Sequence, residues 1–166
     1  HLQGGAAEAA ASAFETILTW QPERHEVRVK LAEVRSELGA RDAARSIYLQ
    51  LVDDELWEGA GIDRNELLRR AGELCLETDD ERAVALLAGL PAPSPDSELA
   101  ERSAEQLYGA YSRIGMESAA LAVALERASA HREPHARRGW TERAYRFSAG
   151  TERARLLEDL VLLDPD

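Results

Sequence analysis

Apolar residues recur at helical spacing through residues 27–52, in two runs separated by a glycine. The first run consists of Val27, Leu31, Val34 and Leu38. Intervals of three and four residues place these side chains on one face of a helix. Gly39 follows directly, and glycine ends helices readily because it adopts the left-handed conformation without a steric penalty. The pattern therefore predicts a helix that ends at a tight turn.

The second run predicts another helix, which folds back on the first. It consists of Ala43, Ala44, Ile47, Tyr48 and Leu51. The adjacent alanines are small enough to let two helix backbones approach closely, so we expect an antiparallel hairpin. One hairpin cannot bury both apolar stripes by itself. Neighbouring hairpins of the same kind are therefore expected.

The same reasoning along the chain predicts about nine helices and no strands. Their expected ranges are 6–19, 22–38, 40–57, 64–77, 81–89, 95–115, 116–131, 134–148 and 151–164. Proline, glycine and aspartate mark the breaks, above all in the loops 58–62 and 91–96. Asp63 and Ser94 are expected to cap the helices that follow them.

The turn residues recur at a nearly constant interval, which favours a repeat array over a bundle. Gly5, Gly39, Thr78, Gly115 and Gly150 are spaced by 34, 39, 37 and 35 residues. An alanine follows each turn after four or five residues: Ala10, Ala44, Ala83, Ala120 and Ala154. The two longer intervals match the two longer loops.

A helix–turn–helix unit of about 34 residues with an A-x3-F pattern and a closing proline resembles the tetratricopeptide repeat. Ala10, Phe14 and Pro22 form one half of the motif. Further matches are Leu31, Ala32, Gly39, Ala44 and Tyr48, then Leu107, Tyr108, Tyr111, Gly115 and Ala120, then Trp140, Ala144 and Phe147. Arg28, Arg35 and Arg70 depart from it, because Trp, Tyr and Leu are usual there.

The resemblance implies an all-α fold, a right-handed α-solenoid of antiparallel helix hairpins. We expect residues 1–166 to form a single repeat domain. Both ends fall at points where an array would continue, so we also expect the chain to be a fragment of a longer protein.

The net charge of −11 argues against a nucleic-acid partner, because such a field repels phosphate backbones. No apolar run approaches 18 residues, so no membrane partner is expected either. The single cysteine, Cys75, excludes an internal disulfide and is expected to be buried. The N-terminus lacks a secretion pattern, so we expect a cytoplasmic protein and leave the periplasm open.

The resemblance further implies that the first helix of each hairpin lines a concave groove that binds a peptide or a partner protein. Position within the repeat selects Asn65, Leu68, Arg102 and Glu105 as contact residues. It also selects Arg137 or Arg138, of which Arg138 is chosen, and Arg113 is added because it lies beside these positions. The same positions include Gly72, Cys75 and Thr141.

Residues 127–155 contain eight arginines against three glutamates, so this segment has a charge of +5 and the remainder −16. One interpretation is a patch that binds the carboxylates of an acidic partner. The other is a solvated arginine face with partners one helical turn away.

The sequence contains no catalytic motif and implies no cofactor. His131 and His135 are four residues apart, but Pro134 lies between them and breaks the helical spacing of a zinc site. We therefore expect a protein-interaction module and not an enzyme. The alternative is a spacer within a longer array that has no ligand of its own. A weaker third possibility, a helical-bundle enzyme, would need a deep pocket with clustered titratable groups.

Overall fold

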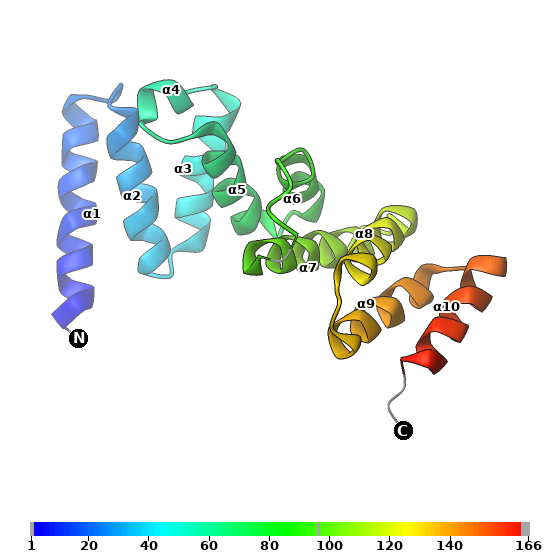
Figure 1. The fold of residues 1–166 in the computed structure, drawn as a ribbon. Coiled ribbons are helices and arrows are strands. Elements are labelled where there is room, and N and C mark those ends of the chain that lie inside the picture. The colour runs from blue at the N-terminus through cyan, green and yellow to red at the C-terminus, as the bar shows by residue number, and fades with distance from the viewer. Residues whose placement is uncertain (1, 96, 164–166) are drawn as a thin grey trace. The chain divides into compact units, whose positions relative to one another are not determined.

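The described part of the chain, residues 2–95 and 97–163 of a computed structural model, contains ten helices and no strand (Figure 1). The helices are α1 (Leu2–Trp20), α2 (His25–Glu37), α3 (Arg41–Asp53), α4 (Trp57–Ala60), α5 (Arg64–Cys75), α6 (Asp80–Leu87), α7 (Glu98–Arg113), α8 (Glu117–Ala130), α9 (Pro134–Phe147) and α10 (Gly150–Leu162). The expected all-α class is confirmed.

The chain divides into two compact units. The N-terminal unit contains residues 1–76 and 85–90, and the C-terminal unit contains residues 77–84 and 91–166. The chain therefore passes between the units at three points, after residues 76, 84 and 90, and the second of these lies within α6. The expectation of a single domain stays a prediction.

In the N-terminal unit, each helix packs mainly on its neighbours along the chain. α1 packs on α2, α2 on α3, and α3 on α5, while the short α4 covers part of α2. Figure 1 shows α1, α2 and α3 side by side as consecutive antiparallel helices. This succession of local pairings is typical of a helical repeat.

The C-terminal unit repeats the arrangement. α7 packs on α8, α8 on α9, and α9 on α10. Its core contains Trp140, the largest fully buried side chain, together with alanines of α7, α8 and α9.

Alanines occupy many of the fully buried positions of the described helices. Ala44, Ala83 and Ala120, three of the five alanines predicted from the repeat, are completely buried. Ala154 is exposed, because α10 turns Leu156 toward the core in its place. Ala43 is also exposed, so only Ala44 of that pair lies in the helix contact.

Three of the predicted turn glycines are left-handed: Gly39, Gly115 and, at φ +55°, Gly150. Gly39 and Gly115 both have φ +76°, directly after α2 and α7. At the third turn Glu77 adopts φ +70° next to the predicted Thr78. The turn expected at Gly5 is wrong, because this residue lies within α1.

Three other boundaries differ from the predictions. The helix expected over 40–57 ends at Asp53, because Glu55 takes the left-handed conformation at φ +55°. The segment expected to be a loop from residue 58 begins within α4. Helix α7 begins after Ser97, whose side chain accepts a hydrogen bond from the N–H of Ala100, so Ser97 is the cap and not Ser94.

Pro22 lies in the turn before α2 and not in its first helical turn. The helix begins at His25 because the backbone N–H groups of Arg24 and His25 bond to the carbonyls of Gln21 and Glu23 instead of starting a helix at Pro22.

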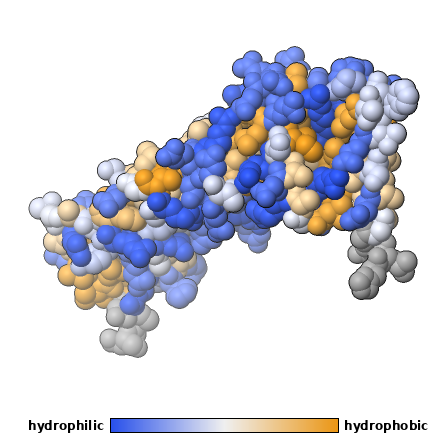
Figure 2. All heavy atoms as spheres, turned by 180° about the vertical axis from the view of Figure 1, so that it is seen from behind, coloured by the Kyte–Doolittle hydropathy of each residue, from blue (hydrophilic) through white to orange (hydrophobic). Residues whose placement is uncertain are grey.

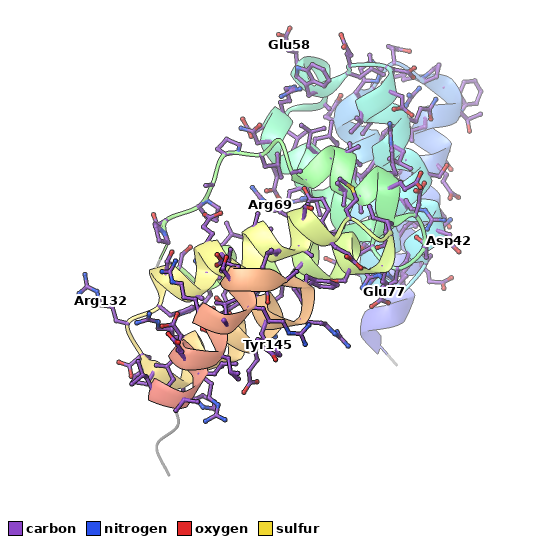
Figure 3. The ribbon with its side chains drawn as sticks, turned by 90° about the vertical axis from the view of Figure 1, so that its right-hand side faces the viewer. Asp42, Glu58, Arg69, Glu77, Arg132 and Tyr145 are labelled. Carbon is purple, nitrogen blue, oxygen red and sulfur yellow. The ribbon has the colours of Figure 1, made fainter. Side chains whose placement is uncertain are left out.

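Hydrophilic side chains form most of the face seen in Figure 2, with hydrophobic residues in patches between them. Trp20 on α1 and Val161 and Leu162 on α10 are the most exposed large apolar residues described, at 81%, 69% and 82%.

Candidate partner-binding surface

In the N-terminal unit, α5 positions two of the predicted contact residues, Asn65 and Leu68. Asp63 caps this helix as expected: its carboxylate accepts hydrogen bonds from the backbone N–H groups of Asn65 and Glu66, at 2.9 and 3.2 Å. Both predicted residues are half-buried. They therefore retain part of their surface for a partner.

Two other residues in the same row of α5 lie in the core and cannot line a groove. Gly72 is buried, and a Cβ added there would lie 2.6 Å from Cγ of Leu87. Cys75 has no exposed surface, which confirms the expected buried cysteine. Of the α5 residues selected by repeat position, those before residue 70 therefore keep exposed surface, and those after it lie in the core.

Arg70, which departs from the repeat pattern, links three helices of the N-terminal unit. Its guanidinium on α5 donates to Glu33 on α2, to the Tyr48 hydroxyl on α3 at 3.2 Å, and to Glu66 on its own helix at 2.7 Å. Burial would lower the pKa of this arginine, but the hydrogen bonds that it donates to Glu66, Tyr48 and Glu33 outweigh this effect and raise the pKa. The same burial raises the pKa of Tyr48.

The other two departures, Arg28 and Arg35, also make contacts outside their own helix. Arg28 donates to the carbonyl oxygen of Pro22 at 2.7 Å, and Arg35 pairs with Glu15 on α1. Arg35 and Arg70 thus make polar contacts between helices, and Arg28 makes one to the turn before its own helix. Sequence reasoning noted the departures but missed this role, and the only available indication was their common residue type.

In the C-terminal unit, Arg113 at the end of α7 is already engaged. Its Nε and Nη2 atoms donate to the two oxygens of Asp80, at 2.6 and 2.7 Å. Asp80 also accepts from the N–H of the left-handed Glu77 at 2.9 Å, and its side chain is only 11% exposed. The hydrogen bonds from Arg113, the stronger cause, and from Glu77 hold the pKa of Asp80 below its usual value.

Gly109 makes room for this ion pair. The Arg113 side chain folds back along α7, so that its Nη1 atom lies 3.1 Å from the position of a Cβ on Gly109. The arginine thereby reaches Asp80 without leaving the helix surface.

The remaining predicted residues of this unit are Arg102, Glu105 and Arg138. Arg102 is exposed on α7 and has no hydrogen-bond or ion-pair partner among the described residues. Glu105 accepts a hydrogen bond from Arg143 on α9 at 3.3 Å, and Arg138 pairs with Glu142 one helical turn away at 3.1 Å. Thr141, predicted near these, is buried and donates to the carbonyl of Arg137.

An arginine and three aromatic rings connect α7 to α9. Tyr108 lies edge-on to Trp140, with ring centroids 6.0 Å apart, and at 5.9 Å from Phe147. The Arg143 guanidinium lies over the Trp140 ring at 4.2 Å. The repeat motif identified the aromatic residues, but Arg143 was counted only as part of the basic segment.

A second polar cluster joins α7, α8 and α9 around the Glu101 carboxylate. It accepts hydrogen bonds from the Trp140 indole at 2.6 Å and from the buried Arg127 at 2.7 Å, and it contacts His131 at 2.9 Å. Arg127 also donates to the carbonyl oxygen of Pro95 at 2.9 Å. Burial alone would raise the pKa of Glu101, but hydrogen bonds from Arg127, Trp140 and His131 outweigh it and lower the pKa.

Residues 1–56, which contain α1, α2 and α3, match the model of the tetratricopeptide repeat family. No curated protein matches the chain at a significant level. Within the described residues, no helix is sufficiently long and apolar to cross a membrane. Tetratricopeptide repeats generally mediate protein–protein interactions and are generally non-catalytic. The described residues are therefore all-helical, and the three N-terminal helices match the tetratricopeptide repeat family.

Proposed function

We propose that this chain is an interaction module that holds a peptide or partner protein against the first helices of its hairpins. In the C-terminal unit the proposed surface consists of Arg102, Glu105, Arg113 and Arg138 on α7 and α9. In the N-terminal unit it consists of Asn65 and Leu68 on α5. Each set is proposed for its own unit.

The observation that supports this proposal best is the exposed cationic surface of α7 and α9. Arg102 is exposed and has no hydrogen-bond or ion-pair partner among the described residues, and Arg138 forms a surface pair with Glu142, whose side chain is 55% exposed. Surface pairs of this kind contribute little to stability, so a partner carboxylate can replace them at small cost. Arg113 contributes less, because its two donors stay bound to Asp80.

The experiment is a pull-down with the immobilised chain at increasing salt, with captured proteins identified by mass spectrometry. We expect specific partners whose binding weakens with salt and is lost in the double variant Arg102→Glu, Arg138→Glu. Arg155→Glu, an exposed change on α10, is the matched control for charge and should retain binding. If the double variant captures the same partners as the unmodified chain, the proposed surface is refuted.

The alternative is a spacer without a ligand, and one observation favours it. Arg113, Arg127 and Arg143 all bind acidic residues of their own unit, so much of the basic segment is satisfied internally. Absence of any saturable, salt-sensitive partner in the same pull-down would support this alternative.

A further inference from the structure

Arg143 is held in one orientation by the aromatic residues beside it. Its guanidinium covers the Trp140 ring, which is only 1% exposed, and lies 5.9 Å from the Tyr108 ring centre. The Tyr108 hydroxyl donates to the backbone carbonyl of Arg143 at 3.4 Å, which braces α9 at this residue. A stacked guanidinium keeps its N–H groups at the edge of the plane, where they are available to a carboxylate.

Most of these donors are unused in the described residues. Arg143 makes one side-chain hydrogen bond, from Nη2 to Glu105 at 3.3 Å, and the two side chains are 38% and 53% exposed. The contrast with Arg113 is large, because that residue binds the shielded Asp80 with two short hydrogen bonds. The ion pair between Glu105 and Arg143 is therefore weak, and Glu105 can be displaced from it.

The surroundings of Arg143 are open and positively charged. Gly139, Arg143 and Arg146 lie in one row of α9 at four- and three-residue spacing. A Cβ added to Gly139 would have no atom within 4 Å, so the row is open at this residue, and Arg146 at its other end is exposed. The helix carries four arginines and one glutamate. Two arginines one helical turn apart on a helix face complement the side chains of an acidic segment better than they complement a single terminal carboxylate.

We propose that Arg143 is the specificity residue that receives a side-chain carboxylate of an acidic partner segment, and that Glu105 is an internal competitor displaced by it. This inference rests on the proposed function, since it names the partner's chemistry for the same surface. It changes the role of Glu105 from a contact residue to an inhibitory one.

The test uses fluorescence anisotropy with the whole chain and a fluorescein-labelled peptide, Gly-Ser-Glu-Glu-Glu-Glu-Ser-Gly, with an amidated C-terminus. The control peptides replace the glutamates by glutamine, once with an amidated and once with a free C-terminus. Removing a surface competitor should tighten binding, so we expect about two- to five-fold higher affinity for Glu105→Gln. We expect about ten-fold lower affinity for Arg143→Gln, partial rescue by Arg143→Lys, and no change for Arg155→Gln.

The affinity of the Glu105→Gln variant for the acidic peptide is the decisive measurement. It should rise if Glu105 is a competitor and fall if Glu105 contacts the partner directly. Unchanged or weaker binding of the acidic peptide by this variant would overturn the inference. Equal binding of the glutamine peptide with a free C-terminus would overturn it as well, by assigning the site to a terminal carboxylate. Circular dichroism verifies that each variant is folded. If the acidic peptide fails to bind but Arg102 and Arg138 still govern protein capture, the inference fails and the proposed function stands.

Discussion

At the scale of single residues, backbone conformation fixes the turns of this protein. Gly39 has φ +76°, and an added Cβ would meet no atom within 4 Å. Any cost of a side chain there arises from the left-handed backbone and not from crowding. Glu55 and Glu77 show that the fold also accepts this conformation without glycine.

Gly39→Val should therefore lower the free energy of unfolding by about 1–2 kcal/mol. Gly89→Val is the matched control, since Gly89 is equally uncrowded but does not have a positive φ. Urea denaturation of both variants measures the difference. Equal stability of the two would mean that the left-handed conformation of Gly39 is not what the turn requires.

Neighbouring alanines provide a second residue-scale test. Ala44 on α3 is completely buried, whereas its neighbour Ala43 is exposed. Ala44→Leu should cost about 1–3 kcal/mol by overpacking, while Ala43→Leu should change stability by less than about 0.5 kcal/mol. Thermal unfolding of the pair measures this, and a reversed order would contradict the packing.

At the scale of helices, the arginines of the C-terminal unit have two different roles. The Arg113–Asp80 pair joins the end of α7 to the start of α6 and is shielded on the acidic side. The Arg143–Glu105 pair joins α9 to α7 and is exposed on both sides. The number of charges in the sequence does not distinguish an arginine that forms a shielded ion pair within the protein from one that can bind a partner.

Double-mutant cycles should distinguish these pairs. For Arg113→Gln with Asp80→Asn we expect a coupling energy of about 1–2 kcal/mol, because the hydrogen bonds are bidentate and charge-assisted. For Arg143→Gln with Glu105→Gln we expect about 0–0.5 kcal/mol, as for an exposed pair. Chemical denaturation gives both values, and similar couplings would remove the basis for calling Glu105 displaceable.

At the scale of the whole molecule, the half-buried carboxylate of Glu101 makes stability depend on pH. The folded-state pKa of Glu101 is lowered, so the unfolded chain binds its proton first on acidification. Its contribution is complete above the unfolded value of about 4.5 and is lost as the pH falls through the lower folded value.

Acidification from pH 6 should therefore leave stability nearly constant until about pH 5 and then reduce it. Glu101→Gln should make this decline shallower, because glutamine does not titrate. Thermal unfolding followed across this range measures the effect, and Glu98→Gln, an exposed residue near the start of α7, is the control. An identical slope in Glu101→Gln and the unmodified chain would show that the cluster does not couple folding to protonation.

The periodicity of apolar residues was enough to predict the helical hairpins, their alanine contacts and the turns at Gly39 and Gly115. These features depend on local spacing and on what one residue type can do at one position, and both can be read along the chain. The helix boundaries at Asp53 and Ser97 were missed, because non-glycine residues can take a left-handed turn and several serines can serve as a cap.

The candidate surface was predictable only in outline. Repeat position selected the exposed Arg102, but it also selected Gly72 and Thr141, which the packing of neighbouring helices buries. The partners of Arg113 and Arg143 are 33 and 38 residues away in the sequence. The sequence by itself thus determined the repeating helical hairpin. The tertiary structure decided which arginines form ion pairs within the protein and which can bind a partner, because these pairs join residues far apart in the chain.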